Sequence, residues 1–236
     1  MPPFFIPFLI GFTVMSLSSI AIYAKGSKEL PIRHHTYFHA TVPFIAATAY
    51  LAMAFAIGDI MKPDGSITFV ARYMDWSITT PILLAGLTLA ALHDRKEAAG
   101  FMVAIITLDV LMIVTGLLSS LALVPWVKLI WFLWSCAAFL GVLYILWVPL
   151  RGISRNLGGA MDKAFNKNLL FLTVVWVLYP VVFAVGPEGT GAITTEASVW
   201  AILVLDILAK VVFAFYAAGN LEAAHRHGRT AEGYSA

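Results

Sequence analysis

The sequence predicts an all-α membrane protein, a bundle of seven transmembrane helices. Of its 236 residues, 61% are hydrophobic and only 12% are charged, about half the charged share of a typical soluble domain. The mean hydropathy of +0.88 excludes a disordered chain, which needs low hydrophobicity and high net charge. The net charge of +2 gives no basic footprint, so we expect no nucleic-acid partner. The single cysteine, Cys136, excludes a disulfide within the chain.

Seven apolar stretches are each long enough to cross a bilayer, which takes about 20 residues. They cover residues 4–24, 38–58, 73–92, 98–119, 123–149, 169–186 and 192–219. The connections between them are short and carry glycine, proline and charged residues. We therefore expect one membrane domain over residues 1–220, followed by a polar, loosely ordered cytoplasmic tail over residues 221–236.

The basic residues of the connections fall almost entirely on one side of the predicted bundle. Lys62 lies in a loop of the poorer side, and Lys128 starts the fifth span. The richer side carries Lys25, Lys28, Arg33, Arg95, Lys96, Arg151, Arg155, Lys163, Lys167, Arg226 and Arg229. Because basic loops stay in the cytoplasm, this predicts an outside N-terminus and a cytoplasmic C-terminus in the cell membrane. The first span lacks a basic leading region and a cleavage site, so we expect it to be retained.

The last span contains an acid and a base within an apolar run. Asp206 and Lys210 are four residues apart and therefore share one helix face. Charged groups at membrane depth are costly unless paired, which makes each a candidate functional residue. Two interpretations remain open from this span alone. The pair is either a structural ion pair, or a site where a desolvated lysine binds an aldehyde as a Schiff base.

Two further spans carry residues that suit such a site. In the third span, Arg72, Asp75 and Thr79 lie near one helix face, so Asp75 and Thr79 can share a hydrogen bond. The sixth span contains an aromatic pair followed by proline, at Trp176, Tyr179 and Pro180. That pair indicates either ordinary packing or one wall of a slot for a flat apolar ligand.

Taken together, these motifs resemble those of the microbial rhodopsins, seven-helix proteins that bind retinal. The resemblance extends over nearly the whole chain. Its most specific parts are the runs Arg72-Tyr-x-Asp75-Trp76-x-x-Thr79-Thr80-Pro81 and Asp206-x-x-x-Lys210. Weaker matches are Val42-Pro43 with Tyr50, Asp109 with Thr115-Gly116, and the Trp176, Tyr179 and Pro180 group.

The resemblance implies a light-driven ion transporter rather than an enzyme. Lys210 would carry all-trans retinal as a protonated Schiff base, with Asp75 and Asp206 as counterions. Asp75, followed by Thr79, would be the primary proton acceptor, and Arg72 would direct the released proton outward. Thr80 and Asp109 would link the third and fourth spans. The expected retinal-binding residues are Tyr50, Trp76, Thr80, Leu83, Met112, Gly116, Trp176, Tyr179, Pro180 and Phe183.

The chain departs from well-known outward proton pumps of this family at Gly86. Gly86 lies eleven residues after Asp75, on the same helix face and roughly 16 Å along it. Those pumps place a carboxylate proton donor there, so the donor position is vacant and the pattern is Asp-Thr-Gly. His39 is a candidate donor or relay, because imidazole titrates in a useful range. The alternatives are a histidine bonded near the membrane interface and proton uptake directly from bulk water.

On the outer side, Glu188 and Glu196 form a possible proton-release group, or are solvated acids of the loop before the last span. Ser198 and Ala49 stand where some relatives have a release carboxylate and a histidine partner of the counterion. Leu83 suggests green absorption. The negative charge of Asp75 argues against an anion pump.

The resemblance therefore predicts a light-driven outward proton pump, with a photosensory rhodopsin that signals through a membrane partner as the alternative. It also implies a bacterial origin and a homo-oligomer, either a trimer or a pentamer. A carotenoid antenna has only Gly141 in its favour, through a gap beside the ring. We predict no metal site.

Overall fold

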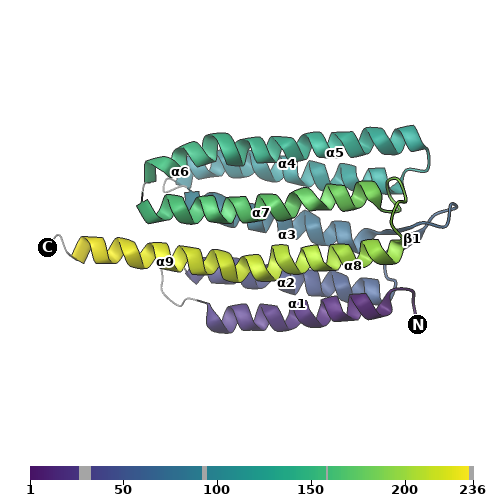
Figure 1. Ribbon diagram of the computed structural model, residues 1–236, viewed down its shortest axis with the longest axis horizontal. Helices are drawn as coiled ribbons and strands as arrows, with labels where there is room; N and C mark the ends of the chain where they lie inside the picture. Colours follow the sequence, from purple (N-terminus) through teal and green to yellow (C-terminus); the bar gives the residue numbers. More distant parts are fainter. Residues whose placement is uncertain (27–32, 92–94, 158, 234–236) are drawn as a thin grey trace.

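The computed structural model describes residues 1–26, 33–91, 95–157 and 159–233, which form an elongated helical bundle (Figure 1). The described residues contain seven helical rods that are long and apolar enough to cross a membrane, as predicted. Four of them are single helices, α1 (Phe5–Lys25), α2 (Arg33–Ala54), α3 (Val70–Ala91) and α4 (Arg95–Leu121).

The remaining rods include two that pass through π-helical segments. The fifth rod runs through α5 (Pro125–Ile145), η1 (Leu146–Leu150) and α6 (Arg151–Leu157), and the sixth is α7 (Gly159–Val185). The last rod runs through α8 (Thr195–Asp206), η2 (Ile207–Val212) and α9 (Phe213–Gly233). Pro149 lies inside η1, where a proline without an N–H is compatible with the wider turn.

A β-hairpin that the sequence analysis did not predict joins α2 to α3. Strands β1 (Asp59–Met61) and β2 (Ile67–Phe69) pair antiparallel, with Asp59 opposite Phe69. At the turn, Gly65 has a φ of 81° and its N–H donates to the carbonyl of Lys62 at 2.9 Å. Lys62 Nζ donates to the carbonyl of Ser120 at 2.8 Å, which fastens the hairpin to the end of α4. The N-terminus lies at this hairpin end of the bundle, and the C-terminus at the opposite, C-terminal end (Figure 1).

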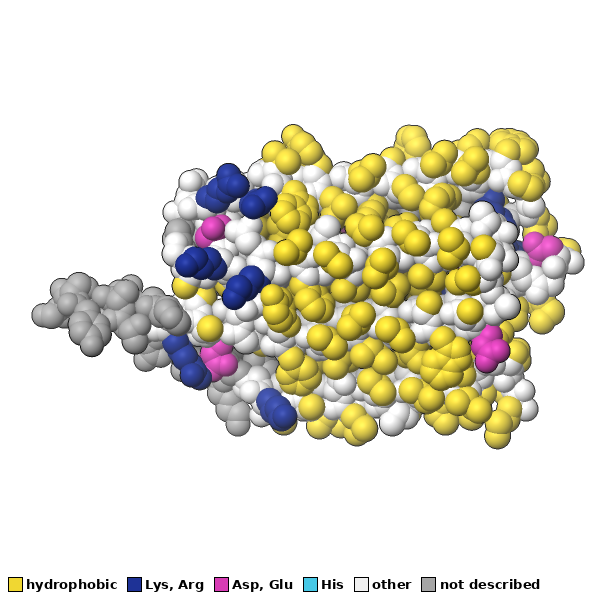
Figure 2. All heavy atoms as spheres, in the orientation of Figure 1, with side chains coloured by type: hydrophobic (Ala, Val, Ile, Leu, Met, Phe, Trp, Pro, Cys, Tyr) yellow, Lys and Arg dark blue, Asp and Glu magenta, His cyan; other side chains and the backbone are white. Residues whose placement is uncertain are grey.

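The outer surface of the bundle is apolar along most of its length. Figure 2 shows hydrophobic side chains covering the middle of the visible face, with lysine and arginine gathered at the C-terminal end. Large hydrophobic side chains such as Ile6, Leu133 and Val174 are exposed on the outer surface of the bundle. A surface of this kind suits lipid rather than water, which fits a multi-pass membrane protein.

The structure corrects the boundaries of several predicted segments, including the sixth span, which begins at Gly159 rather than at residue 169. Helix α2 ends at Ala54 rather than at residue 58, because the chain turns through residues 55–58 into the hairpin. Helix α9 continues to Gly233, so residues 221–233 are helical rather than loosely ordered. The connections at 27–32 and 92–94, and the side chains of Arg33, Arg95, Lys96 and Arg229, lie outside the description, so part of the predicted charge asymmetry is not described.

Candidate functional site

The centre of the bundle holds a buried lysine between two buried carboxylates. Lys210 lies in η2, Asp206 at the end of α8 and Asp75 in the second turn of α3, and their side chains are almost fully enclosed. Lys210 Nζ donates a hydrogen bond to Asp75 Oδ2 and lies 3.3 Å from Asp206 Oδ1. One buried cation therefore faces two buried anions, an arrangement in which each charge depends on the others.

Asp206 receives hydrogen bonds from three side chains on three other helices. The Tyr50 hydroxyl of α2 donates to Oδ2 at 2.8 Å, and the Tyr179 hydroxyl of α7 donates to Oδ1 at 2.8 Å. The indole N–H of Trp76 in α3 donates to Oδ1 at 3.3 Å. Asp75, by contrast, keeps Oδ1 without a hydrogen-bond partner among the described residues. The Tyr50 contact places its hydroxyl beside the Asp206 carboxylate.

The Thr79 hydroxyl bonds to the main chain of Asp75. It donates to the carbonyl oxygen of Asp75 at 2.9 Å, one helical turn back. The expected hydrogen bond between these two residues is therefore present through the backbone. Thr79 is fully buried, so this hydrogen bond lies on the inner face of α3.

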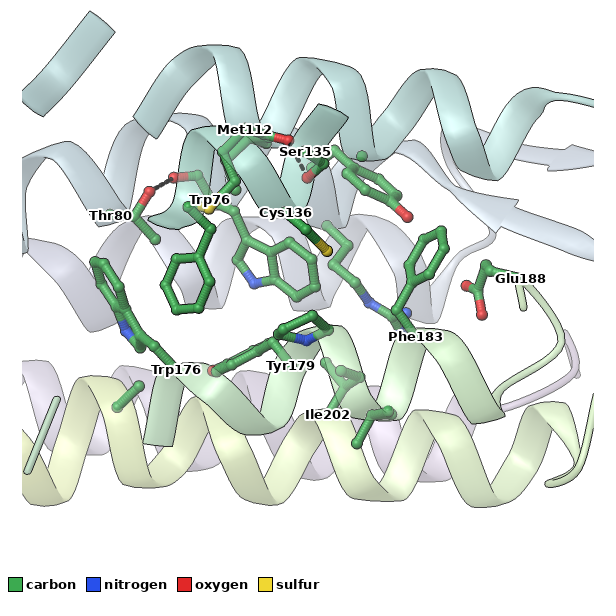
Figure 3. A pocket seen from close by; sticks show the side chains of 18 of the residues that line it. Trp76, Thr80, Met112, Ser135, Cys136, Trp176, Tyr179, Phe183, Glu188 and Ile202 are labelled. Atoms are coloured by element: carbon green, nitrogen blue, oxygen red, sulfur yellow. Dashed lines mark hydrogen bonds between the residues drawn. The ribbon is translucent and has the colours of Figure 1, made fainter. Parts of the chain in front are cut away.

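A largely apolar cavity extends from Lys210 between α3, α4, α5 and α7 (Figure 3). The rings of Trp76 and Tyr179 meet edge to face, with centroids 5.3 Å apart, and form part of one wall. Nearly all the residues expected to bind retinal line this cavity, namely Trp76, Thr80, Leu83, Met112, Gly116, Trp176, Tyr179, Pro180 and Phe183. Tyr50 differs from this group because it contacts Asp206 instead.

The link expected between Thr80 and Asp109 is present. Thr80 Oγ1 lies 2.6 Å from Asp109 Oδ2 and 2.7 Å from the carbonyl of Trp76. A hydroxyl has one proton, so it can donate to only one of these two oxygens. The Thr80 hydroxyl therefore donates either to Asp109 Oδ2 or to the carbonyl of Trp76 at any one time.

Polar groups line the hairpin end of the cavity. Arg72 is buried, with its guanidinium carbon 4.9 Å from the centroid of the Phe69 ring. Glu188 is buried as well, and a Cβ added at Gly186 would lie 3.2 Å from Glu188 Oε2 and 3.3 Å from Ser198 Oγ. Glu188 and Ser198 thus come together beside Gly186. Glu196 does not share this burial, since its side chain is exposed in the first turn of α8.

Asp59 is an additional acid on this side that the sequence analysis did not select. Asp59 pairs with Phe69 across the hairpin, so their two side chains lie on the same face of the hairpin. The Phe69 ring on this face contacts Arg72. Its Oδ1 is buried without a hydrogen-bond partner in the described part of the chain. Burial raises the pKa of Asp59 to about 6, although the Arg72 guanidinium opposes this shift.

The other side of the cavity, toward the C-terminal end, is apolar around α3. Leu83 and Leu87 are buried, and a Cβ added at Gly86 would have no described atom of another part of the chain within 4 Å. His39 therefore does not fill the space at Gly86. Its imidazole is buried between α2 and the last rod, with its ring centroid 6.0 Å from that of Phe213.

The gap suggested at Gly141 is not open in this structure. A Cβ added at Gly141 would lie 3.1 Å from Cδ1 of Leu108, whose side chain fills the space. Leu108 therefore occupies the space that was suggested as a gap.

Comparison with known proteins decides what kind of site this is. Residues 5–222 match the family described as bacteriorhodopsin-like protein. The chain belongs to this family. It is a microbial rhodopsin and not an enzyme, and the family is one of retinal-binding rhodopsins.

Relatives match the chain over most of its length. Archaerhodopsin-2 of Halobacterium sp. (strain aus-2) is 37% identical over 212 residues, which are 87% of this chain and 80% of that protein. Bacteriorhodopsin of Halobacterium salinarum is 33% identical over 209 residues, 86% of this chain and 78% of that protein.

Two solved rhodopsin structures superpose on the chain closely. The thermophilic rhodopsin from Rubrobacter xylanophilus gives a TM-score of 0.87 at 36% identity, covering 93% of this chain and 96% of that one. The rhodopsin of Coccomyxa subellipsoidea, described as a light-driven proton pump, gives 0.82 at 31% identity, covering 91% and 95%. The prediction of a microbial rhodopsin is thereby confirmed.

Several lining residues of this rhodopsin were not identified from the sequence. They are Tyr73, Ile113, Phe132, Ser135, Cys136, Phe139, Val182 and Ile202, of which Ser135, Cys136 and Ile202 are labelled in Figure 3. Most are small or apolar residues in apolar spans, where composition does not distinguish a cavity wall from ordinary packing. Cys136 is the exception. It is the single cysteine of the chain, and helical spacing places it on the same face as Phe132 and Phe139, a signal that could have identified this face.

Proposed function

We propose that this rhodopsin is a light-driven outward proton pump. The observation that carries the proposal is the Lys210 amine, buried between two carboxylates at one side of an aromatic cavity. The two sides of that cavity differ, since buried Arg72 and Glu188 lie toward the hairpin end, and leucines with Gly86 lie toward the C-terminal end. Such an asymmetry is what directional proton transfer needs.

The residues present fit all-trans retinal. The buried amine of Lys210 is the group that condenses with an aldehyde, and the cavity beside it has the apolar, aromatic lining that a polyene requires. When bound through Lys210, retinal supplies a photoisomerisable chain attached to a protonated nitrogen. Asp75 and Asp206 would balance the charge of that nitrogen. The side chains of Trp76, Trp176 and Tyr179 would hold the polyene of retinal in place. Leu83 adds no polar group beside it, which favours green absorption.

Asp75 is the proton acceptor in this proposal. Its carboxylate contacts Lys210 directly and retains one oxygen without a described partner, whereas Asp206 already accepts three hydrogen bonds. Transfer of a proton from the Lys210 nitrogen to Asp75 neutralises both groups together, which avoids leaving one buried charge unpaired. Arg72 follows on the hairpin side, so the proton is directed toward that end.

Glu188 is the better of the two candidate release residues. It is buried at the Arg72 side of the cavity beside Ser198, while Glu196 is an exposed acid of α8. Release through Glu188 would bring the proton from the cavity to the hairpin-end surface.

The hairpin end faces outward in this proposal. Of the basic residues whose side chains are described, Lys25, Arg151, Arg155, Lys163, Lys167 and Arg226 belong to the C-terminal end, where Figure 2 shows lysine and arginine. Basic segments remain in the cytoplasm, so the C-terminus and the tail from residue 221 would be cytoplasmic. We place the protein in a bacterial cell membrane as a trimer or pentamer.

His39 would return the proton from the cytoplasmic side, directly or as a relay. Gly86 provides no carboxylate, and His39 is a buried titratable side chain at this end of the bundle. The space beside Gly86 leaves room for water on the path toward Lys210. Direct uptake from bulk water is the competing route.

The decisive experiment is the light-induced pH change of an unbuffered suspension of cells that contain the protein with retinal. We expect acidification that a protonophore abolishes. An unchanged pH with intact, photocycling pigment would overturn the pump and favour the photosensory alternative. For the return step, His39→Ala should slow reprotonation of the Lys210 nitrogen, and added azide should restore it. An unchanged rate would favour direct uptake.

A further inference from the structure

A second cavity, separate from the retinal cavity, lies between α1, α2 and the last rod near the C-terminal end. Its volume is about 170 Å³, which is room for water molecules. Of the residues that the structure describes, three with titratable side chains line it, from three helices: Lys25 of α1, His39 of α2 and Glu222 of α9. No role in the function described above accounts for this cavity.

A buried titratable side chain, His39, lines the cavity. His39 is 6% exposed, and its Nδ1 has no hydrogen-bond partner within the residues that the structure describes. A buried ring nitrogen is costly unless it is hydrogen-bonded, and water in a polar cavity is an ordinary partner for it. Water in this cavity would be a partner that can exchange protons with the imidazole.

The rim of the same cavity is exposed and charged. The side chain of Lys25 is exposed, and that of Glu222 is 45% exposed and accepts a hydrogen bond from Arg226 at 2.6 Å. An exposed carboxylate captures protons from solution and releases them quickly, whereas an ammonium and a guanidinium do not. Among the described residues that line the cavity, Glu222 is therefore the exposed group that can receive a proton and pass it inward.

We infer that this cavity is the hydrated path by which His39 exchanges protons with the solution at the C-terminal end, with Glu222 as the residue that collects them. The Glu222 carboxylate takes a proton from solution and gives it to cavity water. That water gives a proton to Nδ1 of a neutral His39, and the net result is one proton moved inward. The inference rests on the proposed role of His39 for its place in pumping, although the hydrated path itself does not require that role.

The path can be blocked by a side chain at its wall. Gly219 lines the cavity, and a Cβ added there has no described atom of another part of the chain within 4 Å. Gly219→Leu therefore introduces a large side chain at a position where its Cβ meets no clash. Gly100 of α4 has equally open space and lies outside the cavity, so Gly100→Leu is the matched control. Ala218→Leu, at a second lining position, replaces Gly219→Leu if that variant does not form pigment.

The first measurement is the exchange of the imidazole C2 hydrogen of His39 with D₂O in the dark, followed by mass spectrometry. We expect exchange in the wild type and in Gly100→Leu, and severalfold slower exchange in Gly219→Leu. Equal rates in Gly219→Leu and Gly100→Leu would overturn the hydrated path. This readout does not depend on light or on pumping.

The second measurement is the rate of reprotonation of the Lys210 nitrogen after a flash. Gly219→Leu should slow it by about tenfold, and Glu222→Gln should slow it increasingly as the pH of the solution rises. An unchanged rate in Glu222→Gln at high pH would overturn the collecting role. If His39→Ala leaves reprotonation unchanged, the proposed donor role fails, while hydrogen exchange still decides whether the path exists.

Discussion

The ammonium of Lys210 donates a hydrogen bond to the carboxylate of Asp75, a residue 135 positions earlier in the chain. This contact joins η2 to α3 across the interior of the bundle, where both side chains are 2% exposed. Asp206, 3.3 Å from the same nitrogen, is the second anion but is held by three other donors. The two carboxylates are therefore not equivalent, and variants of each should behave differently.

Asp75→Asn should abolish light-induced acidification and shift the absorption of the pigment to longer wavelength. The variant removes the proposed acceptor and one of two negative charges beside the Lys210 nitrogen. Absorption spectra and pH recordings of the same membranes test both effects. Asp109→Asn is the control, because it changes a carboxylate that contacts Thr80 rather than Lys210. Wild-type acidification in Asp75→Asn would refute its role as acceptor.

Tyr50→Phe should destabilise the pigment while preserving its packing. The ring is 2% exposed and stays in place, but the 2.8 Å hydrogen bond to Asp206 is lost. Hydrogen bonds to charged groups contribute about 1.5–3 kcal/mol, so thermal bleaching should occur at a clearly lower temperature. Tyr144→Phe, at a side chain that is 63% exposed, should bleach like the wild type. Similar bleaching of the two variants would show that the bond contributes nothing.

Glu188→Gln should delay the appearance of the pumped proton outside the membrane, whereas Glu196→Gln should not. Glu188 is buried at the end of the cavity, and Glu196 is exposed on α8. A pH-indicating dye in the outer solution, recorded after a flash, measures the delay. If only Glu196→Gln delayed the signal, the exposed acid would be the release group instead.

Asp59→Asn should stabilise the protein above about pH 6 and have little effect near pH 4. Burial raises the pKa of Asp59 to about 6, whereas the pKa of an aspartate in the unfolded chain is about 3.9. The folded state therefore binds this proton more tightly, so wild-type stability falls as the pH rises through that interval and then levels off. Asparagine removes this loss because it does not ionise.

Melting temperatures at about pH 4 and about pH 8 test this prediction. Asp64→Asn is the control, since Asp64 is exposed in the same hairpin and its hydrogen bonds with Ser66 lower its pKa. A variant of Asp59 that is less stable than the wild type at high pH would mean that attraction to Arg72 outweighs burial.

The charged residues of the site could be predicted because charges are rare in apolar spans. Asp75, Asp206 and Lys210 stand out from their neighbours, and helical spacing places Asp206 and Lys210 on one face. The resemblance to microbial rhodopsins then supplied the aromatic residues of the cavity, including Trp76 and Trp176, which composition alone did not distinguish from packing.

Other features have no signal in the sequence. The hairpin has strands of three residues, too short for an alternating pattern, so Asp59 was not selected. The π-helical turn at Lys210 arises from a shifted hydrogen-bond register, which composition does not record. The second cavity requires three helices to be in place, and its lining residues are spread from Ile22 to Glu222 along the chain.

The empty space beside Gly86 has a consequence for how readily this protein can be redesigned. A glycine inside a helix costs roughly 0.5–1 kcal/mol relative to alanine, so α3 keeps this opening against its own helical preference. Since a Cβ there would meet no described atom of another part of the chain within 4 Å, an alanine can be installed at this position without a clash. Alanine at this position should therefore stabilise α3 without disturbing its neighbours, so the glycine is a position where helix stability can be gained by a single substitution.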